Sequence, residues 1–365
     1  MTTTAPPFLE TDPSILVDSL VAAFESASGK TLYPAQVERL MVDVMAYREG
    51  LVRQTIQYAA EQNLVDFATG ARLEALGRLL GVSSRIAATS ATSTWHLTLP
   101  EALVADYVVP SGFQAMSPSG TAWATVADAL IPAGQLSVNV DASAAVPGAA
   151  DNGFAVGSVF SPLVGNLSIS AVTASEGGAD AETDDQLRAR ILLAPFGFSV
   201  AGSSGAYRFH ALGAHPSIVD VAVANIGPGM VGVYPLTVTG LPSAEVKDAV
   251  TAALSDETVR PLCDAVTVSD PTLVLFALEV NLTTFDTADN AVVLANVQDM
   301  ARSYVKDRAA GLGRDLIGSQ VIKLLSLDGV YKVELVGWAD RVLAPNEWAD
   351  GTTIPTIHLI GSAHG

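Results

Sequence analysis

The sequence is poor in cysteine and in basic residues. Its single cysteine, Cys263, excludes an internal disulfide framework and a metal site built from several cysteines; we expect a small buried side chain rather than a reactive thiol. Lys and Arg number 19 against 38 Asp and Glu, a formal net charge of −19. That balance argues against binding nucleic acid or an anionic membrane through a basic face and leaves room for a basic partner. No apolar run approaches the roughly 20 residues that a membrane helix needs.

Charge of either sign is also scarce. Only 16% of residues are charged, against about 25% in a typical soluble domain, whereas 49% are hydrophobic. A surface with so few charges suits extensive contact with other proteins. A length of 365 residues predicts two to four domains. Residues 1–11 form an arm rich in Thr and Pro without the pattern of a signal peptide, so we expect assembly in a reducing cytoplasm.

The strongest pattern lies in residues 33–82. Pro34 is expected at the first helical position of a helix that runs to about Gln62, roughly 40 Å long. Its apolar residues recur at spacings of three, four and seven: Val37, Leu40, Met41, Val44, Met45, Leu51, Val52, Ile56, Ala59 and Ala60. A short leucine helix follows and is expected to end at Gly81. This rod is longer than one small domain needs, which favours an assembly element over the alternative, an ordinary core helix of a monomer.

The remaining patterns predict an α+β protein with four parts. Residues 1–90 form a helical region, in which Asp12 caps a first helix that ends near Gly29. Residues 91–177 carry short alternating strands and predict a small all-β module. Residues 178–270 start with a capping box at Thr183 and predict a first α+β domain. Residues 271–365 predict a second α+β domain, with one long strand from Thr272 and a partly ferredoxin-like order of elements.

No motif assembles catalytic or cofactor chemistry. Residues 227–232 have the glycine spacing of a dinucleotide site, but a strand follows instead of a helix, so we expect a hairpin turn. Residues 202–205 lack the P-loop lysine and are interpreted as a helix entry. The five histidines show no metal-ligand spacing; His210 and His215 are close enough in sequence to meet, but separate packing roles are favoured. Helix capping explains the acids at residues 184–185 and 289. We expect no enzyme activity, cofactor or metal.

Two stretches together carry a family resemblance. One is AAEQNLVDFATG at residues 59–70, followed by LEALG at 73–77 and GV at 81–82. The other is EGGADAETDDQLRARI at residues 176–191, followed by SVAG at 199–202 and AY at 206–207. In this order and spacing they resemble the baseplate J-like family of contractile-tailed phages and phage-tail-like particles. The resemblance covers about residues 35–340.

The resemblance implies a structural role in the virion, at the tail baseplate. Two copies of such a protein pair with one smaller tail protein into a wedge, and neighbouring wedges close a sixfold ring around the hub and spike. Further implied partners are sheath-proximal and fibre-attachment proteins, with no nucleic acid and no membrane. In this sequence, the resemblance implies a bundle helix at about residues 34–64. Its expected partner interface is Val37, Leu40, Met41, Val44, Leu51, Val52 and Ile56.

Two other classes of function stay open at this point. A tail-associated adhesin or receptor-binding module could use the β-rich middle of the chain, but the sequence has neither repeats nor a stalk pattern. A cell-wall-degrading enzyme would need paired carboxylates in a cleft, and the available acids lie at helix starts or in loops.

Overall fold

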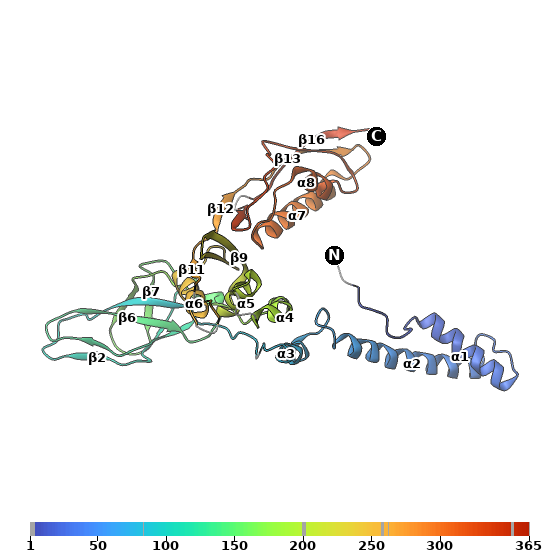
Figure 1. Ribbon diagram of the computed structural model, residues 1–365, viewed down its shortest axis with the longest axis horizontal. Coiled ribbons are helices and arrows are strands. Elements are labelled where there is room, and N and C mark those ends of the chain that lie inside the picture. The colour runs from blue at the N-terminus through green and yellow to red at the C-terminus, as the bar shows by residue number, and fades with distance from the viewer. Residues whose placement is uncertain are drawn as a thin grey trace. The chain divides into compact units, whose positions relative to one another are not determined.

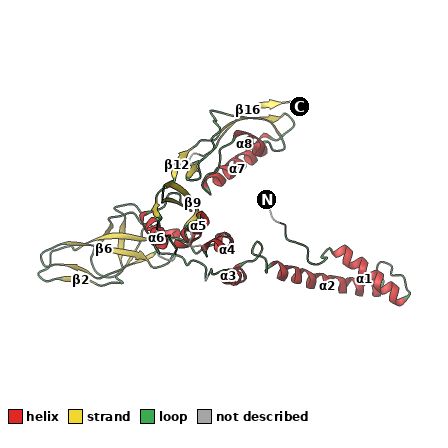
Figure 2. Cartoon of the chain, viewed as in Figure 1, coloured by secondary structure: helices red, strands yellow, loops and turns green. Residues whose placement is uncertain are grey.

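The computed structural model describes residues 4–82, 84–198, 202–256, 259–261, 263–351 and 354–364. Within them the chain is mixed α+β, as predicted, with eight α-helices, a small six-stranded barrel and further small sheets (Figures 1 and 2). The chain divides into two compact units. Unit 1 comprises residues 1–85 and 183–192, and unit 2 comprises residues 86–182 and 193–365. None of the described helices is long and apolar enough to cross a bilayer.

Unit 1 begins with two helices side by side, α1 (Pro13–Ser28) and α2 (Val37–Glu61) (Figure 1). The Asp12 carboxylate accepts from the Ser14 amide at the start of α1, and Gly29 ends the helix in the left-handed conformation, as predicted. The prediction that α2 starts at Pro34 is wrong. Ala35 takes a positive φ of 67°, which breaks the helical path, so α2 starts three residues later.

The rest of unit 1 is a tight corner followed by α3 (Gly70–Leu79). The Val82 amide donates to the Gly77 carbonyl and the Gly81 amide to the Arg78 carbonyl, the paired bonds of a Schellman C-cap. Gly81 supplies the positive φ of 85° that this cap needs, as predicted. α4 (Asp184–Gly197) begins in unit 1 with the predicted capping box: Thr183 and Gln186 exchange backbone-to-side-chain hydrogen bonds of 2.9 and 3.3 Å.

Unit 2 begins with the predicted all-β module, which is a closed barrel of strand order β1-β6-β4-β3-β7-β8. Its strands are β1 (Thr92–Thr98), β3 (Gln114–Met116), β4 (Ala122–Thr125), β6 (Ser137–Ala144), β7 (Val159–Pro162) and β8 (Ser168–Ala171), with a 3-10 turn at Ala149–Asp151. The alternating pattern predicted at Trp95 and Leu97 buries both side chains completely. Three aromatic rings fill the barrel. Trp95, Trp123 and Phe160 pack with tilted or edge-on geometry at centroid distances of 4.8–6.3 Å. β2 (Tyr107–Val109) and β5 (Ala129–Ile131) form a separate two-stranded ribbon.

A three-stranded sheet follows, in the order β11-β10-β9. β9 (Ile218–Gly227) and β10 (Met230–Thr237) are antiparallel, which confirms the hairpin turn predicted at residues 227–232. β11 (Ala265–Val268) runs parallel to β10. The sheet packs with α5 (Ser204–Ala214) and α6 (Ala244–Leu254). The helix entry predicted at residues 202–205 is confirmed, because the Ser203 side chain caps α5.

The last part of unit 2 differs from the sequence prediction in one respect. The single long strand expected from Thr272 is wrong, because it breaks into β12 (Thr272–Leu275) and β13 (Glu279–Phe285), which join different sheets. β12 pairs with β15 (Glu347–Asp350), and β13 lies between β14 (Val330–Leu335) and β16 (Thr356–Ala363). α7 (Asn290–Ala309) and α8 (Gly318–Leu325) pack on the latter sheet. The α+β class is confirmed; the ferredoxin-like detail is not, since these described sheets have two and three strands.

Candidate functional site

Helix α2 is apolar on both of its long sides. One side packs against α1, where Leu16, Val42 and Ala46 are buried. All seven residues of the predicted partner interface are exposed, from 40% at Leu51 to 64% at Val37. All but Ile56, which follows Val42 by fourteen positions, fall on the other side of the helix. A set of large apolar side chains in contact with water on one helix face is typical of an interaction surface. We call this set the α2 face: Val37, Leu40, Met41, Val44, Leu51, Val52 and Ile56.

Three further residues extend the α2 face. Met45, Tyr47 and Tyr58 are exposed by 64%, 67% and 49%. Tyr47 follows Leu40 by seven positions and Tyr58 follows Leu51 by seven, so the heptad spacing contained this signal although the predicted interface left both tyrosines out. A shallow apolar hollow of about 350 Å³ lies over the first turns of α2, lined by Val37, Leu40, Met41, Val44 and Met45.

The face continues to the corner between α2 and α3. A second hollow of about 420 Å³ there is lined mainly by Ala59, Ala75, Leu76 and Leu79, and Leu79 is 80% exposed. The corner itself is held by the buried Gln62 side chain, which donates to the Phe67 carbonyl and accepts from the Thr69 amide. These bonds fix the path of residues 62–69 and therefore the position of the second hollow relative to α2.

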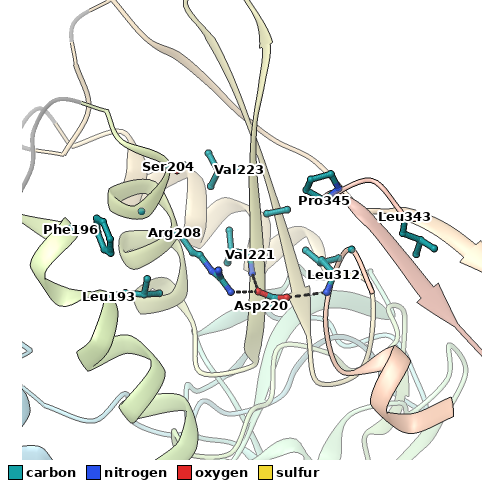
Figure 3. Close-up of a pocket in the computed structure, with 13 residues that line it drawn as sticks. Leu193, Phe196, Ser204, Arg208, Asp220, Val221, Val223, Leu312, Leu343 and Pro345 are labelled. Atoms are coloured by element: carbon teal, nitrogen blue, oxygen red, sulfur yellow. Dashed lines mark hydrogen bonds and ion pairs between the residues drawn. The ribbon is translucent and has the colours of Figure 1, made fainter. Parts of the chain in front are cut away.

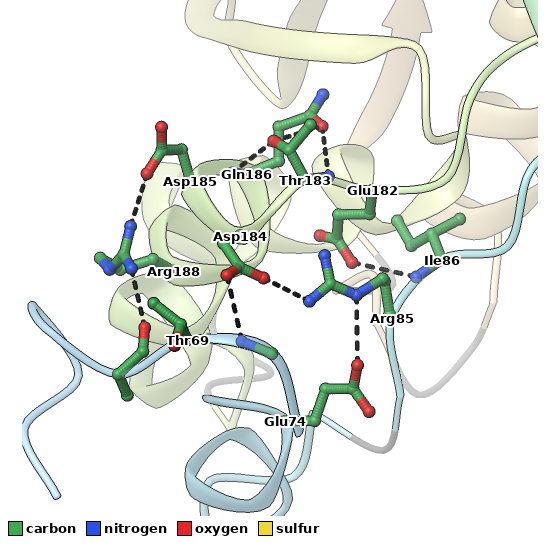
Figure 4. A network of polar contacts seen from close by, with 12 residues as sticks. Thr69, Glu74, Arg85, Ile86, Glu182, Thr183, Asp184, Asp185, Gln186 and Arg188 are labelled. Carbon is green, nitrogen blue, oxygen red and sulfur yellow. Dashed lines mark hydrogen bonds and ion pairs between the residues drawn. The ribbon is translucent and has the colours of Figure 1, made fainter. Parts of the chain in front are cut away.

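A polar network in unit 1 ties α3 to the start of α4 (Figure 4). The Asp184 carboxylate accepts from the Arg85 guanidinium at 2.5 Å and from the Gly70 amide at 3.1 Å, and Arg85 also pairs with Glu74. The hydrogen bond from Arg85, followed by that from Gly70, lowers the pKa of Asp184. The prediction that capping explains both acids at residues 184–185 is thus incomplete, since Asp184 binds the neighbouring helix start.

Arg188 adds a second tie in the same network. Its guanidinium donates to the carbonyls of Val65 and Ala68, each at 2.9 Å, and to Asp185. These carbonyls belong to the corner that follows α2. The network therefore holds α3, the corner and the first turns of α4 together. This positioning role of Arg85, Asp184 and Arg188 is structural and involves no catalysis.

Unit 2 contains an open pocket of about 540 Å³ (Figure 3). Its walls are of mixed polarity and come from α4, α5, β9 and the loops near Leu312 and Pro345. Asp220 accepts from Arg208 at 2.7 Å and from the Leu312 amide at 3.0 Å. Asp220 therefore links β9 to the loop after α7. It is the one carboxylate among the described residues that line the pocket, so these residues do not form the carboxylate pair that glycoside hydrolysis needs.

The remaining candidate residues take part in packing, hydrogen bonding or helix capping. The His215 side chain bonds to Ser217 at 2.7 Å, and burial lowers its pKa. His210 lies edge-on to the adjacent Phe209 ring, and burial lowers its pKa as well. Asp289 caps α7, as predicted. Among the described residues, no cluster of His, Cys, Asp and Glu could hold a metal ion.

The expectation that the Cys263 side chain is buried is wrong. Its side chain is exposed, because it lies in the loop before β11 and outside the packed face of that sheet. It lies beside the Asp264 carboxylate, with a sulfur-to-oxygen distance of 3.7 Å.

Comparisons with known proteins agree with this architecture. Four family models match in succession: the baseplate J-like N-terminal domain at residues 38–91, the barrel domain at 96–180, the central domain at 199–270 and the C-terminal domain at 276–357. Baseplate protein J of Escherichia phage P2 is 33% identical over 165 residues, which are 44% of this chain and 54% of that protein. The chain thus spans about half the length of this curated relative.

The matched models define a class of protein, the structural proteins of phage-tail baseplates. Within that class, the chain belongs to the baseplate J-like family. Among solved structures, it is similar to a chain of the six-fold symmetrised cryo-EM structure of the anti-feeding prophage baseplate. That match has a TM-score of 0.45 and 14% identity, and it covers 92% of this chain and 90% of the other.

The Asp184 network predicts a pH dependence. Because the pKa of Asp184 is lowered from its ordinary value of 3.8, its stabilising effect is complete above that value and is lost as the pH falls below it. Since the carboxylate is 35% exposed, we expect a loss of less than about 1 kcal/mol in local opening free energy. Amide exchange at Gly70, corrected for intrinsic rates, should therefore accelerate in acid. Asp184→Asn should remove this acid-induced acceleration. Asp185→Asn, at a 94% exposed position, should keep it.

The Asp220 contacts predict a local effect in unit 2. Asp220→Ala leaves the Leu312 amide and Arg208 without this partner, a loss of about 1–3 kcal/mol in local opening free energy. Hydrogen exchange of residues 310–316, followed by mass spectrometry, should then accelerate about fivefold or more. Asp248→Ala, an exposed acid on α6, is the matched control and should change nothing there. Unchanged exchange in both variants would show that Asp220 does not hold this loop.

Proposed function

We propose that this chain is a structural wedge component of a contractile-tail baseplate. It acts by assembly and not by catalysis. Two copies join one smaller tail protein through their N-terminal helices, and neighbouring wedges close into a sixfold ring around the hub and spike. In this proposal the protein resides in the virion tail, after synthesis and assembly in the host cytoplasm.

The observation that carries the proposal is the α2 face. Each fully buried Leu, Ile, Val or Met side chain contributes about 1.5–3 kcal/mol relative to exposure, so partner helices over seven such residues gain a large driving force. Spacings of three, four and seven match the contact positions of a helical bundle. A bundle with helices of a second copy and of the smaller tail protein would cover the face.

The domain division follows from the same proposal. Residues 1–90 provide the core-bundle helices, 91–177 a β-rich module, and 178–270 and 271–365 two α+β domains that contact neighbouring wedges. Heterologous contacts between such domains close into a ring when the rotation per wedge is one sixth of a turn. Sheath-proximal and fibre-attachment proteins are further proposed partners.

Substitutions on the α2 face test this proposal. Leu40→Asp or Leu51→Asp places a charge in the bundle, which costs about 3 kcal/mol or more, roughly a 100-fold loss of association. Both residues are exposed in the isolated chain, so its circular dichroism spectrum should not change. Asn296→Asp, which adds a charge at an exposed polar position of α7 outside the α2 face, is the control. Purified tail particles should lack either Leu variant and contain the control; normal particle yields from both Leu variants would refute the interface.

A further inference from the structure

The barrel module has an unusual charge distribution. Residues 86–187 contain no Lys or Arg, although the chain has 19 of these residues. The single histidine there, His96, bonds to the Asn139 side chain. The module itself, residues 91–177, carries only acids: Glu101, Asp106, Asp128, Asp141, Asp151 and Glu176. Apart from His96, every charged contact that this module makes with another molecule must therefore come from a carboxylate.

The β2–β5 ribbon gives this acidic module an apolar outer surface. Val109, Ala129 and Ile131 point into the barrel core and are 1–4% exposed. Val108 and Leu130 are directly paired across the ribbon and are 55% and 49% exposed. Cross-strand partners share one face. The solvent side of such a ribbon normally carries polar residues, so this pair is an exception.

Neighbouring loops carry further exposed apolar residues. The Gly134 amide donates to the Leu103 carbonyl at 2.9 Å, which brings residues 103–104 beside the 132–136 loop. Leu103, Val104 and Leu136 are 40%, 101% and 47% exposed. We call the five residues Leu103, Val104, Val108, Leu130 and Leu136 the ribbon patch.

Acidic side chains border the ribbon patch. Asp106 accepts from the Ala133 amide in the adjoining loop, and Asp128 accepts from the Ser111 amide at the end of β2. Glu101 precedes the patch in the chain and is exposed. The patch thus combines apolar residues with a border of negative charge and has no Lys or Arg near it in sequence.

We propose that the ribbon patch docks a different protein of the baseplate, whose surface has apolar side chains flanked by Lys or Arg. Cations on the partner would complement the acidic border, which gives specificity and orientation, while the apolar residues provide burial. This inference rests on the proposed function, because it places the partner in the same particle.

Other occupants fit the charges less well. The same module of a second copy would bring carboxylates against carboxylates, a repulsive contact. Elsewhere in the chain many cations already pair with its own acids, such as Arg39 with Asp43 and Arg53 with Glu49. An anionic membrane would repel the acidic border.

The test compares charges of opposite sign at one exposed position. A photo-cross-linking amino acid replaces Leu130 in particles assembled with the full chain, and Val104 is changed to Asp, Lys or Ser. We expect an adduct with a Lys- or Arg-containing peptide of another baseplate protein. Val104→Lys should lower its yield about two- to fivefold relative to Val104→Asp, because the two variants lose the same apolar area and differ in charge. The cross-linker at Val164, an exposed residue outside the patch, is the control.

Several outcomes would overturn the proposal. Particles that contain the chain but give no adduct at position 130 would show that the patch is free, while the wedge function stands. An adduct with a second copy or with lipid would assign the patch to that occupant. Equal yields for Val104→Asp and Val104→Lys, or a lower yield for Asp, would exclude a basic partner. Wild-type particles that lack the chain altogether would refute the wedge function as well.

Discussion

Helix α2 has apolar residues on two opposite sides, and α1 covers only one of them. A helix of 25 residues is about 37 Å long, so its uncovered side exposes a continuous series of large apolar side chains to water. Exposure of such a surface to water is unfavourable. Among the described residues of unit 1, Arg72 of α3 lies over the Tyr58 ring at one end of this side, and the seven residues of the α2 face stay exposed. The simplest physical solution is intermolecular, with helices of other chains on the exposed side. The proposed wedge depends on this single requirement.

Three carboxylates serve as joints between elements. Asp184 binds the first amide of α3, Asp220 binds an amide of the loop after α7, and Asp340 binds the first amide of α8. In each case a carboxylate satisfies a backbone N–H that secondary structure leaves unpaired. Such joints fix the directions in which helices and loops leave the packed cores. For an assembly protein, these fixed directions determine which surfaces are presented to neighbours.

The sequence predicted most elements because their signals are local. The Asp12 cap, the Gly81 C-cap, the Thr183 capping box and the alternation at Trp95 each depend on residues a few positions apart, and all were confirmed. The errors have physical causes as well. Ala35 adopts a backbone conformation that alanine rarely takes, so nothing in the pattern indicated that α2 starts at Val37. Continuous apolar alternation through residues 272–282 concealed the break between two sheets, which is a tertiary choice.

The candidate site was predicted in part for the same reason. The periodicity of α2 identified the apolar residues, but periodicity alone cannot tell which of two apolar sides α1 covers. The most direct test of the central idea is the mass of the purified chain by light scattering, alone and coexpressed with the smaller tail protein. We expect a stable species with two copies of this chain and one of the partner. A monodisperse monomer that does not bind the partner would contradict the wedge. The exposed side of α2 would then have no role in assembly.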